Sequence, residues 1–154
     1  MSDEEYKARE RPSWHETWMD VAKTISKRSY DSRLQVGAII VAADNSTVLS
    51  VGYNGNYSGG PNKSESDREG ESGLIHSEIN AIIKCDYHFH KNKIMYVTHF
   101  PCPMCCKAII NARIISVIYN DVYRDMSGSL FFEQAKVKCY KLKEILYKNL
   151  SRIQ

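Results

Sequence analysis

The chain has 154 residues, which is the length of one ordinary domain and enough to bury a hydrophobic core without disulfides. Hydrophobic residues make up 43% and charged residues 25%, a composition that argues against wholesale disorder. The net charge of +3 comes from Lys and Arg scattered among acids, so it does not form the basic surface typical of nucleic-acid binding. We expect one compact domain over residues 1–154, in which residues 1–12 form a flexible tail.

The cellular location and the state of the thiols follow from two further features. The longest apolar run, residues 37–43, is far shorter than the roughly 20 residues that span a membrane. The beginning of the chain, MSDEEYKARERP, is too charged for a signal peptide. We therefore expect a cytoplasmic protein without membrane contact, whose five cysteines are free or metal-bound rather than paired in disulfides.

The first half of the chain predicts one helix and one hairpin. Apolar residues recur at helical spacing over residues 13–29, with Ser13 as the N-cap and Glu16 as its capping-box partner. Residues 35–43 and 46–53 are rich in β-branched side chains and flank an Asp-Asn pair, which predicts a β-hairpin.

A long polar segment separates this hairpin from the second half. Residues 54–73 are Gly-rich and aperiodic, which indicates a surface loop of the kind that is often functional. After it, helical and extended patterns alternate and predict an α/β sandwich with parallel strands in its second half. The predicted helices cover 76–85, 103–112, 129–135 and 142–150, and the predicted strands cover 93–98, 115–120 and 137–140.

Two of these helix starts carry residues that bind metals. Residues 76–78 (HSE) open one helix, and residues 101–105 (PCPMC) open the next. Catalytic zinc takes three thiolate or imidazole ligands and keeps a fourth position for water. The Cys-x-x-Cys spacing places both thiols on one side of a helical turn, whose positive end favours thiolates. We predict that His76, Cys102 and Cys105 hold one Zn²⁺ ion.

Two neighbouring residues define the kind of zinc site. Cys106 lies about 100° further round the helix and should point into packing. Glu78 follows the histidine by two residues, so its carboxylate can move a proton between a zinc-activated water and a substrate. Because a structural zinc site has no need of that carboxylate, the sequence predicts an enzyme.

H-x-E followed by P-C-x-x-C is the signature of zinc-dependent nucleobase deaminases. From near Trp14 to about residue 140, the chain resembles the deoxycytidylate (dCMP) deaminase family. The matching segments are KRS at 27–29, VGAIIV at 36–41, GYNG at 52–55, HSEINAI at 76–82 and THFPCPMCCKAIINARI at 98–114.

The resemblance implies a three-layer α/β/α sandwich around a mixed five-stranded sheet. It implies hydrolytic deamination of dCMP to dUMP for thymidylate synthesis, in which a water activated by zinc attacks C4 of cytosine. Glu78 would protonate N3 and later the departing ammonia. The family is usually hexameric and often activated by dCTP and inhibited by dTTP, and such an effector would bring Mg²⁺ with it.

The resemblance also implies a set of substrate-binding residues. Asn54, in GYNG, matches an asparagine that contacts the sugar, although a turn role before the following glycine is the alternative. Arg33, His99 and Tyr123 match positions near the base, sugar or 5′-phosphate. The alternatives are a solvated charge for the arginine and core packing for the tyrosine. Ser77 replaces the family's usual alanine, and we place it in the same set.

Two departures from the family pattern stand out. Arg113 occupies a position where glycine commonly ends the helix, so a left-handed backbone there would be strained by about 1 kcal/mol. Residues 56–75 contain no Cys or His, so the second, structural zinc of some relatives has no ligands in this loop. Nucleotide regulation, to which the loop contributes in relatives, therefore stays open.

Three other functions remain as alternatives. The site could accept dCTP as well as dCMP. A polynucleotide deaminase acting on tRNA or single-stranded DNA would need a basic, aromatic-lined groove, which the scattered charge does not provide. A non-enzymatic zinc module would close the fourth coordination position with Cys106 or another side chain, and Glu78 argues against it.

Overall fold

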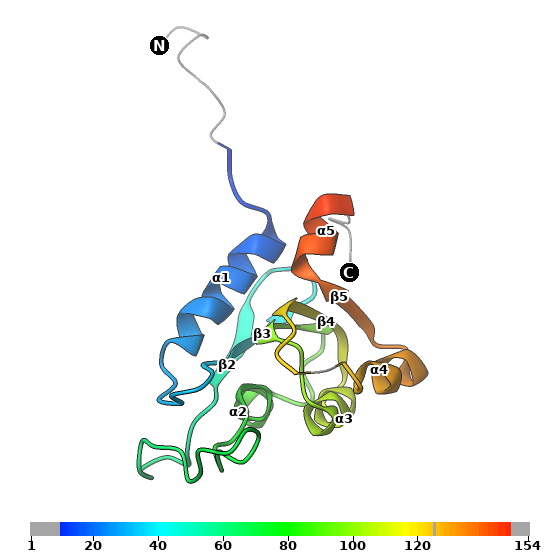
Figure 1. Cartoon of the computed structure of the whole chain (residues 1–154). Coiled ribbons are helices and arrows are strands. Elements are labelled where there is room, and N and C mark those ends of the chain that lie inside the picture. Colours follow the sequence, from blue (N-terminus) through cyan, green and yellow to red (C-terminus); the bar gives the residue numbers. More distant parts are fainter. Residues whose placement is uncertain (1–9, 125, 149–154) are drawn as a thin grey trace, which may run out of the picture.

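The computed structural model describes residues 10–124 and 126–148. Most of the tail predicted over residues 1–12 therefore lies outside the described residues, as does the end of the helix predicted over 142–150. The described chain is a five-stranded mixed sheet with helices on both faces (Figure 1), which confirms the expected three-layer α/β class.

Every predicted helix and strand is present, with ends that differ by a few residues. The helices are α1 (Trp14–Ser26), α2 (Ser77–Lys84), α3 (Pro103–Asn111), α4 (Ser129–Ala135) and α5 (Leu142–Lys148). The strands are β1 (Gly37–Ala42), β2 (Val48–Tyr53), β3 (Lys93–His99), β4 (Ile114–Asp121) and β5 (Lys138–Lys141).

The sheet has the strand order β2-β1-β3-β4-β5. The strand β1 pairs antiparallel with both β2 and β3, whereas β3, β4 and β5 run parallel. This arrangement confirms the predicted hairpin and the parallel second half. Because the central strands are covered on both faces, β1 is buried along its whole length, which explains its continuous apolar sequence.

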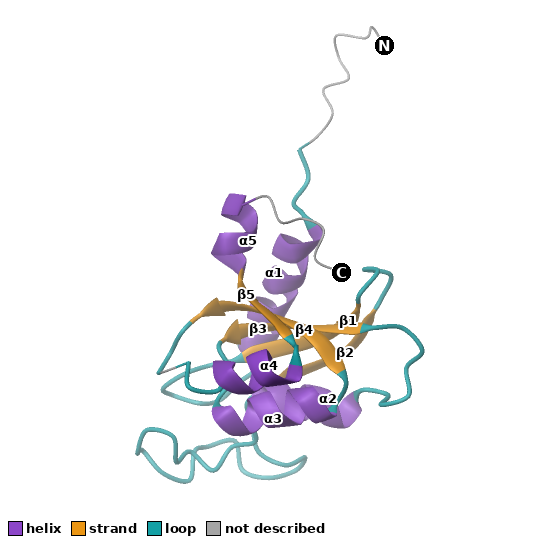
Figure 2. Ribbon diagram, turned by 90° about the vertical axis from the view of Figure 1, so that its right-hand side faces the viewer, coloured by secondary structure: helices purple, strands orange, loops and turns teal. Residues whose placement is uncertain are grey.

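The helices divide into two layers, as Figure 2 shows. One face of the sheet carries α1 and α5. There, Met19 of α1 packs with Ile39 and Tyr96 of the sheet in one core cluster. The other face carries α2, α3 and α4, whose cluster includes Cys106 and Phe132. The residues predicted to act in chemistry lie in or beside the second layer.

A glycine allows α2 to lie close against the sheet. A Cβ atom on Gly52 would overlap the carbonyl oxygen of Ser77 and lie 2.5 Å from the backbone nitrogen of Ala81. Any larger side chain would push the start of α2 away from β2, so this glycine fixes the depth of the helix start.

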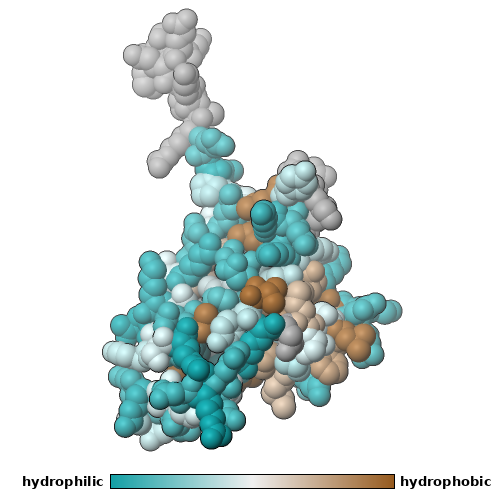
Figure 3. All heavy atoms as spheres, viewed as in Figure 1, coloured by the Kyte–Doolittle hydropathy of each residue, from teal (hydrophilic) through white to brown (hydrophobic). Residues whose placement is uncertain are grey.

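The start of α1 confirms the predicted capping box. The backbone N–H of Glu16 donates to the Ser13 hydroxyl at 3.2 Å, and the Ser13 N–H donates to the Glu16 carboxylate at 2.8 Å. No helix among the described residues has the length and apolarity needed to cross a membrane. On the face in Figure 3, hydrophilic residues predominate and apolar ones gather mainly on the right-hand side.

Candidate active site

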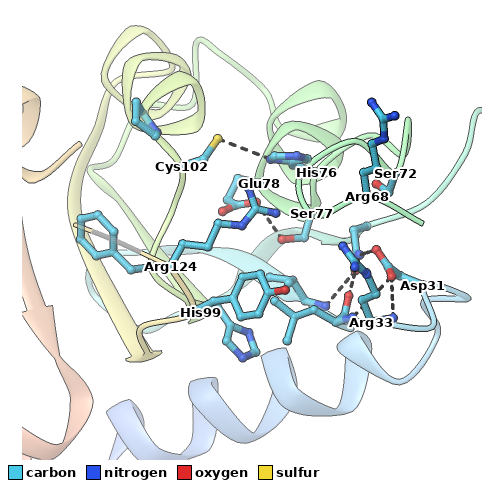
Figure 4. A pocket seen from close by; sticks show the side chains of 17 residues that line it. Asp31, Arg33, Arg68, Ser72, His76, Ser77, Glu78, His99, Cys102 and Arg124 are labelled. Atoms are coloured by element: carbon cyan, nitrogen blue, oxygen red, sulfur yellow. Dashed lines mark hydrogen bonds between the residues drawn. The ribbon is translucent and has the colours of Figure 1, made fainter. Parts of the chain in front are cut away.

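Two helix starts face each other at the centre of the site (Figure 4). His76 is the N-cap of α2, and its side chain makes no capping hydrogen bond. Its Nδ1 atom instead lies 3.5 Å from Sγ of Cys102 and 3.4 Å from Sγ of Cys105. Cys102 is the N-cap of α3, and its sulfur accepts a hydrogen bond from the Cys105 backbone N–H. The structure thus brings together the three predicted metal ligands.

The geometry of this group fits a zinc ion. One ligand atom from each of the three side chains lies within 4.8 Å of the other two. Nitrogen and sulfur ligands placed tetrahedrally at zinc bond lengths are roughly 3.6 Å apart, close to the observed nitrogen–sulfur separations. Within residues 10–124 and 126–148, this is the only cluster of three or more His, Cys, Asp or Glu residues with metal-binding geometry.

The three predicted ligands shift one another's pKa values through their mutual contacts. The contact with the Cys105 thiol, assisted by His76, lowers the pKa of Cys102 to about 4. The same contact, and then burial, raises the pKa of Cys105. The hydrogen bond with Cys102 also raises the pKa of His76. Because zinc binds thiolates and a neutral imidazole, metal binding would release these protons.

Two prolines fix the backbone at the first cysteine. Cys102 lies between Pro101 and Pro103, and a residue that precedes proline is restricted to extended backbone. Its observed φ of −65° and ψ of 163° are of this kind. The second proline occupies the first helical position, where the missing N–H is not needed.

Cys106 points away from the other two cysteines. Its side chain is fully buried in the core cluster beneath α3, with Sγ 3.5 Å from the Pro101 carbonyl oxygen. A Cβ atom on Gly128 would lie only 2.6 Å from this sulfur, so the space around it is filled. Burial raises the pKa of Cys106 to about 12. The cysteine is thus part of the packing, as its helical position predicts.

Glu78 lies in the first turn of α2, two residues after the histidine. The residue is 4% exposed, and the hydroxyl of Ser77 donates a hydrogen bond to Oε2 of Glu78 at 2.9 Å. Burial raises the pKa of this carboxyl group. The residue lines the same pocket as His76 and Cys102. A buried carboxylate beside a metal-binding group can accept a proton and later return it to a bound substrate.

The pocket also collects the five residues predicted to bind substrate. Arg33, Asn54, Ser77, His99 and Tyr123 all line it, although they come from separate parts of the chain. The ring of His99 contacts the Thr98 hydroxyl at 2.9 Å, and burial lowers the pKa of His99. No contact in the described chain assigns these residues to a particular part of a ligand, so their individual roles stay predictions.

Asn54 has a structural role in addition to its place in the pocket. Its Oδ1 accepts a hydrogen bond from the Val36 N–H at 2.8 Å. Its Nδ2 donates to the Leu34 carbonyl at 2.9 Å and to the Asp31 carboxylate at 3.2 Å. The asparagine therefore joins the end of β2 to the loop that carries Arg33. This is a larger structural role than the turn role that the sequence offered as an alternative.

Three charged residues of the pocket were not singled out by the sequence analysis. Asp31 is buried and accepts a hydrogen bond from the Arg33 N–H at 2.8 Å, which shapes the loop before β1. Arg68 lies in a charged stretch that has the composition of a solvated loop, and Arg124 follows Tyr123. No local spacing marks these residues, because only the fold brings their three loops to one pocket.

The comparisons with known proteins agree with this geometry. The family model for the cytidine and deoxycytidylate deaminase zinc-binding region matches residues 12–121. The chain therefore belongs to the cytidine and deoxycytidylate deaminase family, and it is a deaminase.

Particular relatives narrow the comparison. Human deoxycytidylate deaminase is 36% identical to this chain, with an alignment that covers 84% of this chain and 83% of the relative. ComE operon protein 2 of Bacillus subtilis is also 36% identical, over 83% of this chain and 70% of that protein. The dCMP deaminase from the cyanophage S-TIM5, in its crystal structure in complex with dCMP and dUMP, is 30% identical in sequence to this chain. It superposes with a TM-score of 0.70 and covers 86% of this chain and 99% of that one.

Proposed function

We propose that this chain is a zinc-dependent dCMP deaminase that converts dCMP and water to dUMP and ammonia. The observation that carries the proposal is the buried carboxylate of Glu78 beside the group of His76, Cys102 and Cys105 in one pocket. The relative that was crystallised with dCMP and dUMP supports the choice of substrate.

The proton transfers are assigned to one carboxylate. When bound, zinc supplies the Lewis acidity that makes water nucleophilic near neutral pH. Glu78 accepts one proton of the attacking water and delivers it to N3 of cytosine. It then accepts the remaining proton from the new C4 hydroxyl group and delivers it to the leaving amine. A C4–O bond forms and the C4–N bond breaks, so ammonia leaves without a redox step. The hydrogen bond from Ser77 orients the carboxylate for these transfers.

Substrate orientation is assigned to the loops around the pocket. Asn54 supports the loop that carries Arg33, which places a guanidinium where it can contact the phosphate of a nucleotide. His99 lies beside the pocket with its pKa lowered by burial, so at neutral pH it presents a neutral ring to the base or sugar. Tyr123 lines the same pocket.

The test is formation of dUMP and ammonia from dCMP by the purified, zinc-loaded protein. Deoxycytidine, dCTP and a cytosine-containing oligonucleotide serve as competing substrates in parallel assays. We expect the highest kcat/KM for dCMP. Preferred turnover of dCTP or of the oligonucleotide would replace dCMP by one of the alternatives. A protein that binds zinc but turns over none of these substrates would support the non-enzymatic zinc module.

Regulation, assembly and location form a second group of predictions. We propose a cytoplasmic hexamer that supplies dUMP for thymidylate synthesis, with dCTP and Mg²⁺ as activator and dTTP as inhibitor. These proposals depend on the resemblance to the family. Sedimentation of the purified protein tests the hexamer, and dCMP turnover with each effector tests the regulation. Turnover that is insensitive to both effectors would contradict the regulatory part.

A further inference from the structure

Arginines from three separate loops line the pocket. Arg33 comes from the loop before β1, Arg68 from the long loop between β2 and α2, and Arg124 from the loop after β4. Figure 4 labels all three around the pocket that contains Glu78. Guanidinium groups are the usual partners of phosphate oxygens, so a pocket lined by these arginines suits a ligand with an anionic tail.

Two of the three arginines are already paired with acids from one loop. Arg124 Nε lies 3.3 Å from a carboxylate oxygen of Glu69, and Arg68 forms a longer ion pair of 3.9 Å with Glu71. No ion pair joins Arg33 to a carboxylate of the described residues, which leaves its guanidinium available.

The guanidinium of Arg124 lies close to the long loop at Gly70. Gly70 has a φ of +79°, and a Cβ atom there would lie 2.6 Å from a terminal nitrogen of this guanidinium. The guanidinium also lies 5.2 Å from the centre of the Tyr123 ring. The guanidinium thus has the Tyr123 ring and the loop at Gly70 as neighbours, and the Glu69 carboxylate is the anion with which it pairs.

We infer that Glu69, through its ion pair with Arg124, limits the length of the phosphate chain that the site accepts. This inference rests on the proposed function and specifies the substrate class of that site. A carboxylate next to Arg124 has the sign and hydrogen-bonding character of a phosphate oxygen, so a nucleotide monophosphate displaces it. A triphosphate brings more negative charge near Glu69 and Glu71, and among the described pocket arginines only Arg33, which has no ion pair, is available to offset that charge.

Binding of the proposed product dUMP and of two related uridine compounds tests the inference without turnover. Dissociation constants of dUMP, dUTP and deoxyuridine are measured by calorimetry on the zinc-loaded protein. With Glu69→Gln, we expect dUTP to bind about fivefold tighter and dUMP less than twofold tighter, because exposed ion pairs have small energies. With Arg124→Gln, we expect dUMP to bind about tenfold weaker and deoxyuridine to bind unchanged, because deoxyuridine lacks the phosphate.

Matched variants control for loop charge and for arginine loss. Asp67→Asn removes a carboxylate from the same loop, and Arg28→Gln removes an exposed arginine outside the pocket. Neither should change the ratio of the dUMP and dUTP constants. In the double variant Glu69→Gln/Arg124→Gln, the effect of the glutamate substitution should disappear, because the two residues act as a pair.

The outcomes separate this inference from the proposed function. If Glu69→Gln changes the dUMP to dUTP ratio no more than Asp67→Asn does, the inference is wrong. The inference is also overturned if Glu69→Gln changes this ratio equally in the wild-type protein and in the Arg124→Gln variant. A wild-type protein that binds dUMP and does not deaminate dCMP contradicts only the proposed function, whereas a protein that binds no uridine nucleotide contradicts both.

Discussion

The two ends of the pocket are built differently. At the inner end, His76, Glu78 and the cysteines lie on the first turns of α2 and α3, which pack against the sheet. At the outer end, the arginines lie on loops, and the ion pair of Arg124 with Glu69 joins two side chains that are 46% and 60% exposed. Helices and strands fix the position of reacting groups, while the sequence of a loop can change without moving those groups. We therefore expect inner substitutions to affect turnover and outer ones to affect binding.

The largest expected effect isolates the chemistry of the inner end. Glu78→Gln keeps the size of the buried side chain but removes its ability to accept a proton. We expect kcat to fall by about 10³-fold while KM for dCMP and zinc content stay near wild type. Steady-state kinetics with metal analysis measures both. Glu133→Gln, on the exposed side of α4, is the control. Unchanged turnover in the Glu78 variant would refute the assigned proton transfer.

The next effect separates the two neighbouring cysteines. Cys105→Ser should weaken zinc binding by about 100-fold or more, because a ligand thiolate is lost. Cys106→Ala should retain zinc and activity and lower the free energy of unfolding by about 1 kcal/mol, because only packing is lost. Competition with a chelator measures the metal affinity, and urea unfolding measures the stability. Zinc loss in the Cys106 variant would mean that the inner end uses a fourth protein ligand.

A substitution at Asn54 probes the outer end. Asn54→Ala leaves the Val36 N–H and the Leu34 carbonyl without their partner, which should lower the free energy of unfolding by about 1.5 kcal/mol. Because the loop with Arg33 loses its support, KM for dCMP should rise more than kcat falls. Asn56→Ala is the matched control, because Asn56 is a half-buried asparagine whose side-chain hydrogen bonds stay within the following loop. A selective loss of kcat would place Asn54 with the reacting groups instead.

The smallest effect lies at the far end of α3. Arg113 has a φ of 62°, so the left-handed backbone expected at this position is present. Its guanidinium lies 4.6 Å from the centre of the Tyr87 ring, which offsets part of the strain. Arg113→Gly should therefore raise the free energy of unfolding by only about 0.5 kcal/mol, with zinc and turnover unchanged. Thermal unfolding tests this, with Arg113→Lys as the control that keeps the strain. A loss of zinc would show that the two ends of α3 are coupled.

The same division explains what the sequence could predict. Cys102 and Cys105 can be predicted as a pair from local spacing, because residues three apart lie on the same side of a helical turn, and Glu78 can be predicted from its place two residues after His76 in the H-x-E motif. The roles of Asp31 and Arg124 depend on loops that meet only after the sheet forms. Their hydrogen bonds and ion pairs join segments without any periodic pattern, so no local signal identifies them.

The paired prolines around Cys102 have a consequence for the order of folding events. Because Pro101 and Pro103 restrict the backbone even in the unfolded chain, residues 101–105 lose less conformational entropy when they close around a metal ion. Holding Cys102 and Cys105 at one point also fixes the first turn of α3, and forming a first turn is the slow, unfavourable step of helix growth. A metal captured early at this segment would therefore act as the nucleus from which α3 grows.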